Sequence, residues 1–198
     1  RNDALDAPDF FTNRLGAKNT PLHRNQYGAT FSGPIKKDRT FFFGSWEGFR
    51  QVAPTVSTTR VPTEAERASV VDPISKALLQ FWPAANAQRA GQTNNFIANV
   101  RATTFDNTYL GKVDHNFSEK DRLSVRWAEY RGKTFTPGAL PDMAGNANIP
   151  VSKSAVLNAT HIFTPTVLNE FRLGFSRNET FITVQDMGFD ASKIFVDS

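Results

Sequence analysis

The sequence lacks cysteine, long apolar runs and any strong cluster of like charge. The absence of cysteine among 198 residues excludes disulfides, thiol catalysis and cysteine-based zinc sites. No apolar run approaches the ~18 residues of a membrane helix, so no helical span is predicted. The net charge is +4, but the longest basic run is Lys36-Lys37. Nucleic-acid surfaces cluster their cations more tightly, so we expect no nucleic-acid partner.

The sequence is instead rich in phenylalanine. Only 39% of the residues are hydrophobic, yet 18 of them are Phe. Phe favours strands, whereas the many Asn, Thr and Ser residues suit polar strand faces and loops. The chain opens on Arg1-Asn2-Asp3, without an initiator methionine or a signal peptide, so we expect a processed chain or an excerpt of a longer one.

Six segments alternate apolar and polar residues with the two-residue period of strands. The predicted strands are 22–33, 40–52, 107–117, 122–131, 153–163 and 167–177. Between them, short turns are predicted at 34–39, 118–121 and 163–166. Long loops are predicted at 1–21, 53–105, 133–151 and 178–198. Within the second loop, Asp72 before Pro73 predicts a helix that runs to Trp82, and Thr63 with Glu66 predicts a capping box.

The strict alternation of short and long connections is typical of outer-membrane barrels, which have tight periplasmic turns and long extracellular loops. Strands of about 10 residues are also long enough to cross a bilayer at a tilt. The fold class predicted is therefore all-β, an antiparallel up-and-down meander that forms an open curved part of a transmembrane barrel, with long loops carrying short helices. About six strands cannot close a barrel alone.

Several motifs resemble, in order and spacing, those of Oar-like TonB-dependent receptors. The strongest is RNQYGATFSGPIKKDRTFFFGSWEGFRQ at residues 24–51. The others are RNDALDAPDFF at 1–11, VPTEAERA at 61–68, DNTYLGKVDHNFSEKDRLSVRW at 106–127 and ATHIFTPTVLNEFRLGFSR at 159–177. The resemblance covers most of the chain, although residues 133–151 and 181–198 carry little of it.

The resemblance implies a receptor in the outer membrane of a Gram-negative bacterium, with a barrel of ~22 strands around a plug. Such receptors bind an extracellular substrate and import it when the TonB complex acts on the N-terminal part. No segment of this sequence matches the plug or the TonB-contacting region. Residues 1–198 would thus be part of the barrel wall, with outer-membrane lipid, the plug, the remaining strands and an unknown substrate as partners.

Charged residues on the polar faces of the strands are candidates for the barrel lumen. They can hold the plug and guide a substrate, or simply be solvated and paired across strands. Glu47 favours the odd-numbered face of 40–52 as the lumenal one, which turns Phe41 and Phe43 inward toward the plug. The lumen-facing candidates are Glu47, Lys112, Asp114, Arg122, Arg126, Glu170 and Arg172.

Aromatic residues recur beside the predicted turns and on the other faces of the strands. Rings of this kind form girdles at the two bilayer interfaces of membrane barrels. Exposed aromatics also serve soluble carbohydrate-binding β-domains, which is the alternative from another class; an adhesion or structural barrel without transport is a third. The interface candidates are Phe42, Trp46, Tyr109, Trp127, Phe163 and Phe175.

No motif for catalysis, cofactor binding or metal binding is expected to operate. The only histidines, His23, His115 and His161, lack metal-binding spacing. Asp114 and His115 are adjacent in a predicted strand, so their side chains point to opposite faces and cannot cooperate directly. The sequence contains no GxSxG, P-loop or dinucleotide fingerprint, so we expect no enzyme activity.

Overall fold

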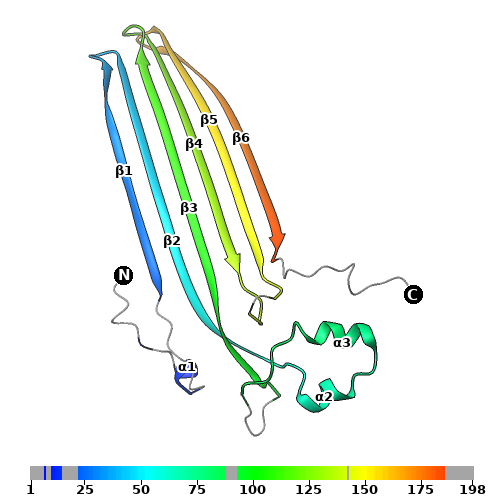
Figure 1. The fold of residues 1–198 in the computed structure, drawn as a ribbon. Helices are drawn as coiled ribbons and strands as arrows, with labels where there is room; N and C mark the ends of the chain where they lie inside the picture. The colour runs from blue at the N-terminus through cyan, green and yellow to red at the C-terminus, as the bar shows by residue number, and fades with distance from the viewer. Residues whose placement is uncertain (1–6, 8–9, 15–21, 88–92, 142, 186–198) are drawn as a thin grey trace.

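A computed structural model of the chain describes residues 7, 10–14, 22–87, 93–141 and 143–185. These residues form one antiparallel sheet in which six strands follow one another in chain order (Figure 1). The strands are β1 (His23–Lys36), β2 (Thr40–Thr59), β3 (Phe96–Asn116), β4 (Asp121–Thr136), β5 (Asn146–Thr164) and β6 (Val167–Val184). The all-β meander predicted from the sequence is confirmed.

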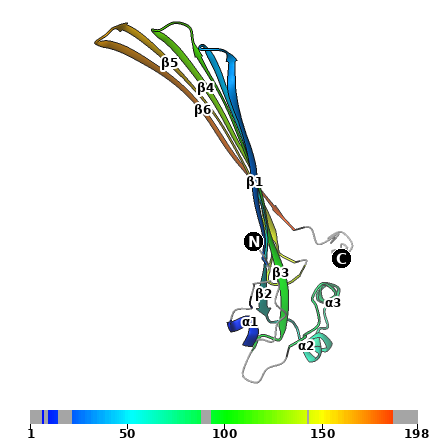
Figure 2. The ribbon, with the colours of Figure 1, turned by 90° about the vertical axis from the view of Figure 1, so that its left-hand side faces the viewer.

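The sheet is a single curved layer whose two faces are covered by no other element of the described chain (Figure 2). Its edges are β1 and β6, and the smallest membrane barrels need about eight strands to close. The short turns gather at one end of the sheet, and the long loops with helices α2 and α3 gather at the other (Figure 1). We call these the turn end and the loop end.

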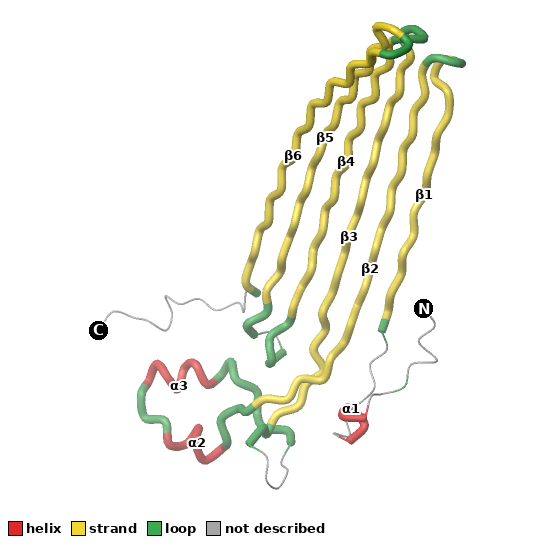
Figure 3. Tube along the Cα trace, turned by 180° about the vertical axis from the view of Figure 1, so that it is seen from behind, coloured by secondary structure: helices red, strands yellow, loops and turns green. Residues whose placement is uncertain are grey.

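The strands extend further toward the loop end than the sequence predicted. The predicted loop 53–105 shrinks to 60–95, the loop 133–151 shrinks to 137–145, and β6 continues to Val184. Strands β2 and β3 pair as far as Thr59 and Phe96, beyond the end of β1, and Figure 3 shows this two-stranded extension. Residues 186–198, the rest of the last predicted loop, lie outside the described part.

Two prolines inside the strands explain why the sequence pattern concealed these extensions. Pro54 pairs with Arg101 on β3, but β1 begins only at His23, which pairs with Val52. The side of β2 toward β1 is therefore a free edge at Pro54, where a missing N–H costs no ladder hydrogen bond.

Pro150 lies in an interruption of the β4–β5 ladder, which pairs Arg131 with Val151 and resumes at Thr134. Gly132 lies within this interruption, and a Cβ there would approach Pro150 Cγ to 2.9 Å. The proline ring thus occupies the space beside a glycine, and the strand passes through a residue that normally ends one.

The described helices are short and lie in connections. Helix α2 (Glu64–Ser69) begins with the predicted capping box of Thr63 and Glu66. Helix α3 (Pro73–Leu79) has Asp72 as N-cap, as predicted, but it ends at Leu79 rather than Trp82. The chain there tightens into i→i+3 hydrogen bonds before Pro83. Helix α1 (Phe10–Arg14) lies in the predicted loop 1–21. No described helix has the length and apolarity to cross a membrane.

Among the described residues, buried hydrophobic side chains are found only at the loop end. A small cluster joins Val61 after β2, Phe96 at the start of β3 and Leu140 in the β4–β5 loop, with Ala98 and Met143 packed against it. By contrast, the large hydrophobic residues of the sheet between the two ends are exposed or only half-buried. The sheet therefore has no core of its own among the described residues.

Candidate functional site in the two faces of the sheet

The register of the ladders assigns every strand residue to one of two faces, because directly opposed residues point to the same side. One row crosses all six strands as Gly33, Phe42, Val113, Val125, Leu157 and Leu173. The adjacent row, on the other side, reads Pro34, Phe41, Asp114, Ser124, Asn158 and Arg172. We call these sides the apolar face and the polar face.

All seven residues proposed from the sequence to face a lumen lie together on the polar face. Glu47 pairs with Gly28 and Thr108, and Lys112 pairs with Arg126 across the β3–β4 ladder. The remaining members follow the same parity in their ladders: Asp114, Arg122, Glu170 and Arg172. Four strands, β2, β3, β4 and β6, thus bring to one surface residues that are up to 125 positions apart in the chain. That this surface lines a lumen stays a prediction.

The ion pairs of the polar face join residues of the same strand, whereas the sequence analysis allowed pairs across strands. Lys112 Nζ donates to Asp114 Oδ2 at 2.8 Å, and Arg172 donates to Glu170 Oε1 at 2.7 Å. In both cases the partners are two residues apart on one strand. Gln26 Nε2 donates across the β1–β2 ladder to Glu47 Oε1 at 3.0 Å.

Arg122 and Arg126 form no ion pair with any described residue. Arg126 also lies directly opposite Lys112, a cross-strand pair of like charges. The β3–β6 part of the polar face therefore has an excess of positive charge, which attracts anionic groups of whatever faces it.

A concavity of about 530 Å³ lies on the polar face over β1–β3. Its lining combines the apolar side chains of Phe43 and Leu110 with the hydrogen-bonded pair of Gln26 and Glu47. Phe43 is 37% exposed on this face, and that its ring points into a lumen stays a prediction. An apolar patch on an otherwise polar surface can hold a partner that is itself partly apolar.

The aromatic candidates lie on the opposite, apolar face. Trp46 pairs directly with Tyr109, and Trp127 and Phe175 lie on either side of Ala155 in the next row. These four residues form a line that crosses β2 to β6 on the loop side of the apolar band. Phe42 lies further inside that band, two rows from Trp46 and opposite Val113.

A second aromatic line at the turn end was only partly found from the sequence. The ring centroids of Phe163 and His161 are 4.3 Å apart in an edge-on arrangement. The rings of Phe117 and His115 are arranged in the same way, with their centroids 4.3 Å apart. The His-x-Phe spacing at 115–117 and 161–163, beside two of the three predicted turns, could have revealed it. Tyr109 to Phe117 spans nine residues of chain. This agrees with the ~9–11 residues that a tilted strand needs to cross a bilayer.

The sheet separates the residues that could resemble a catalytic pair. Asp114 pairs with Lys112 on the polar face, whereas the His115 ring lies 2.8 Å from Thr40 Oγ1 on the apolar face. In the described part of the chain, no group of three or more His, Asp or Glu side chains is placed to hold a metal ion.

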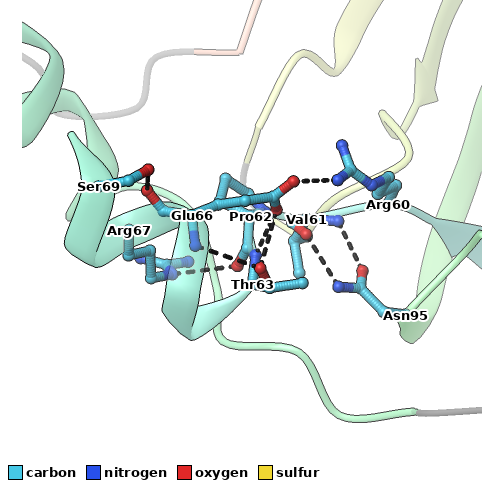
Figure 4. A network of polar contacts seen from close by, with 8 residues as sticks. All are labelled: Arg60, Val61, Pro62, Thr63, Glu66, Arg67, Ser69 and Asn95. Carbon is cyan, nitrogen blue, oxygen red and sulfur yellow. Dashed lines mark hydrogen bonds and ion pairs between the residues drawn. The ribbon is translucent and has the colours of Figure 1, made fainter.

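The loop end carries a polar network that fixes the chain between β2 and β3 (Figure 4). The side chain of Asn95 accepts from the Val61 N–H at 2.7 Å and donates to the Val61 carbonyl at 2.9 Å. Arg67 donates to four backbone carbonyls that connect α2 to the end of α3: Pro62, Leu79, Trp82 and Pro83. Only Val61 is almost completely buried here, at 1% exposed.

Both helix caps of this loop hold ionised carboxylates. The backbone N–H of Thr63 donates to Glu66 and lowers the pKa of that carboxyl, with help from the Thr63 hydroxyl and Arg60. The backbone N–H of Ser75 donates to Asp72 at 2.6 Å and likewise lowers its pKa. Negative charge at a helix N-terminus is also favoured by the helix dipole.

A single-layer sheet with one apolar face, one polar face and aromatic lines at both borders defines the wall of a transmembrane β-barrel. The comparison with family models agrees, since the outer membrane beta barrel domain matches residues 1–72 and 68–196. The chain belongs to this family. No curated protein and no solved structure matches it. The chain is therefore placed in the outer membrane of a Gram-negative bacterium, which rules out the soluble carbohydrate-binding alternative.

Proposed function

We propose that this wall belongs to a TonB-dependent receptor of the Oar-like type, which binds an extracellular substrate and imports it through the barrel. The proposal rests on the motifs at 24–51, 106–127 and 159–177, whose order and spacing resemble that family. It assigns no catalytic step to the chain. Its partners would be the plug, the remaining strands, the TonB complex and a substrate.

The polar face is the observation that best supports transport. A purely structural wall needs only a solvated inner surface, whereas this one combines unpaired Arg122 and Arg126 with an apolar concavity around Phe43 and Leu110. Such a surface can hold a plug in place through its apolar patch and attract anionic groups along its cationic part.

An adhesion barrel without transport is the second candidate, because the loop end exposes apolar side chains away from the sheet. Val71, Ile74, Leu78 and Trp82 recur at helical spacing along and beside α3, and they are between 37% and 86% exposed. Exposed apolar patches of this kind mark contact surfaces for other molecules. The two candidates differ in whether anything crosses the barrel.

Uptake in living cells separates the two candidates. The parent strain, a strain lacking this gene and a strain lacking TonB are compared for uptake of iron-siderophore complexes, peptides, oligosaccharides and a small protein, each radiolabelled. Transport predicts one probe whose uptake falls to background in both deletion strains and returns when the full-length gene is restored. Surface adherence that depends on the gene, with every uptake rate unchanged and independent of TonB, would overturn transport in favour of adhesion.

A further inference from the structure

The apolar face changes abruptly from apolar to charged residues on three neighbouring strands. On β4, β5 and β6 the row Trp127, Ala155 and Phe175 is followed, two residues nearer the loop end, by Glu129, Lys153 and Arg177. Further along the same face come Arg131 and Lys133 on β4 and Glu179 on β6. We call these six charged residues the outer belt.

The outer belt has more cations than its own carboxylates neutralise. Arg131 pairs with Glu129 at 2.6 Å, and Arg177 pairs with Glu179, in each case along one strand. Lys133 and Lys153 lie within ion-pair distance of no described carboxylate, although Lys153 lies opposite Glu129 in the β4–β5 ladder. The two arginine side chains are each 62% exposed, so their remaining N–H donors are open to a partner outside the sheet.

The position of the outer belt identifies the level of the membrane that it meets. It borders the aromatic line that contains Trp127 and Phe175, and such lines lie at the bilayer interface. It also lies toward the long loops, which in outer-membrane barrels are extracellular. The cations are therefore level with the headgroups of the outer leaflet, on the side of the wall that faces lipid.

We infer that the outer belt binds the phosphate groups of the phosphorylated glycolipid that makes up the outer leaflet, lipopolysaccharide. Its phosphates lie next to its acyl chains, so a molecule whose chains cover Leu157 and Phe175 brings them level with Lys153 and Arg177. Arginine forks and lysine ammonium groups are the side chains that bind phosphate best. The inference rests on the barrel family, and transport through the barrel is not needed for it.

Arg50 and His161, which also lie on the apolar face, already have partners within the sheet and are not proposed to bind the glycolipid phosphates. Arg50, on β2, already donates to Asp106 O at 2.6 Å and to Asn107 Oδ1 at 2.8 Å, and its guanidinium lies over the rings of Tyr27 and Phe105. At the turn end His161 contacts Asp121 at 2.5 Å, so a carboxylate already occupies that part of the border. On the apolar face of β4–β6, the described cations that form no ion pair are Lys133 and Lys153 of the outer belt.

The test uses the full-length protein in detergent micelles and the double variant Lys133→Gln, Lys153→Gln. These two lysines break no ion pair when replaced, so the barrel keeps its folded, heat-modifiable mobility on gels. Each cation near a charged membrane surface contributes about a fivefold change in affinity, so the double variant should bind fluorescent lipopolysaccharide roughly 25-fold more weakly. The conservative variant Lys133→Arg, Lys153→Arg should bind like the parent.

A matched control removes the same charge from the opposite face. The control is Arg122→Gln, Arg126→Gln on β4, the strand that also carries Lys133, and these two arginines form no ion pair with described residues. This variant should bind lipopolysaccharide like the parent. Equal losses in the two variants, or no loss in the lysine variant, would overturn the inference.

Three further probes identify the source of the phosphate. Enzymatically dephosphorylated lipopolysaccharide should bind the parent as weakly as intact lipopolysaccharide binds the lysine variant. Vesicles of phosphatidylglycerol and millimolar inorganic phosphate should not displace the intact glycolipid. Displacement by inorganic phosphate would identify a free-anion site instead, and displacement by phosphatidylglycerol would identify a general anionic-lipid surface; either result contradicts the assignment to the outer-leaflet glycolipid.

Discussion

The sheet and the loop end obtain their stability from different surroundings. In the sheet, Phe31 is 62% and Leu173 is 61% exposed, although both lie on the apolar face. At the loop end, Val61 is 1% and Leu140 is 7% exposed, and the backbone around them is held by Asn95 and by a capping box. The apolar residues of the sheet are left for lipid, whereas Val61, Phe96 and Leu140 at the loop end cover one another.

This difference shows that the two regions are surrounded by different solvents. A single layer gains little from its own side-chain contacts, so burial of its apolar face must come from acyl chains. The loop end is surrounded by water, so its packing depends on a small cluster that is buried internally, as in a small soluble domain. Mutations should consequently act through lipid in the sheet and through packing at the loop end.

The largest effect is expected for a charge placed in the middle of the apolar face. Leu157 lies in the row that also contains Val125 and Leu173, between Phe163 and Lys153 on β5. Leu157→Arg should lower the free energy of unfolding by about 2–4 kcal/mol, the cost measured for arginine at a bilayer midplane. Urea titration of the full-length protein in lipid vesicles measures this.

The control for this change is Ser154→Arg on the same strand. Ser154 pairs with Ala128 and Ser176 on the polar face, where an added arginine stays in water. Its effect should stay within about 0.5 kcal/mol, as for surface substitutions in general. Similar losses for both variants would mean that the two faces do not meet different solvents.

A smaller and local effect is expected at the loop end. Leu140→Ala leaves a cavity beside Val61 and Phe96 and should weaken the contact between the β4–β5 loop and the β2–β3 loop by about 2–3 kcal/mol. Faster limited proteolysis within 137–145 should reveal it, with unfolding of the sheet in urea unchanged. Val71→Ala serves as the control, because Val71 is 86% exposed and touches no cluster. Loss of barrel stability in Leu140→Ala would contradict the independence of the two regions.

The membrane-crossing part of the sheet was predictable because the two faces of each strand there have different surroundings. In the sequence of β2, Phe41, Phe43 and Glu47 alternate with Phe42 and Trp46. The register of β2 places these two sets on opposite faces, as the alternation predicted. Toward the loop end both faces meet water, so the two-residue period fades in stretches such as 53–59 and 96–104. Pro54 and Pro150 are residues that normally end a strand. The sequence alone does not show that Pro54 lies at a free edge and Pro150 at a gap in the ladder, because both depend on the pairing partners.

Short-range sequence patterns predicted the helix caps, whereas the tertiary contacts at the loop end have no pattern in the sequence. The spacing of Thr63 and Glu66, and Asp72 before Pro73, are short-range patterns that the structure contains. The cluster of Val61, Phe96 and Leu140 joins residues up to 79 positions apart, and no periodicity relates them. The outer belt was missed because Glu129, Lys153 and Arg177 become neighbours only through the register of β4, β5 and β6.

A weaker effect is expected for loss of one helix cap. Thr63→Ala removes the hydroxyl that accepts from the Glu66 N–H at 3.3 Å, and it should destabilise α2 by about 1 kcal/mol. Hydrogen exchange of the backbone amides at 64–69, followed by mass spectrometry on the full-length protein, should rise roughly fivefold. Thr63→Ser keeps the hydroxyl and should exchange like the parent. Equal exchange in Thr63→Ala would mean that Asn95 and Arg67 hold the loop without the cap.

The smallest effect near neutral pH is expected from the titration of the two caps. The pKa values of Glu66 and Asp72 are lowered in the folded loop by the backbone N–H groups of Thr63 and Ser75. A lowered carboxyl pKa stabilises the folded state above its ordinary value and loses that contribution as the pH falls through the lowered one. The ordinary values are about 4.3 and 3.9, so the loop should be unchanged between pH 5 and 8 and should loosen only below about pH 4.

Trp82 provides the measurement for this titration, because its carbonyl accepts from Arg67, which also binds the end of α3. The difference in fluorescence between the parent and Trp82→Phe isolates its signal from those of Trp46 and Trp127. This signal should change below about pH 4, and Glu66→Gln with Asp72→Asn should remove the change while keeping both caps. A pH response that persists in the Glu66→Gln, Asp72→Asn variant would mean that groups other than the two cap carboxylates cause it.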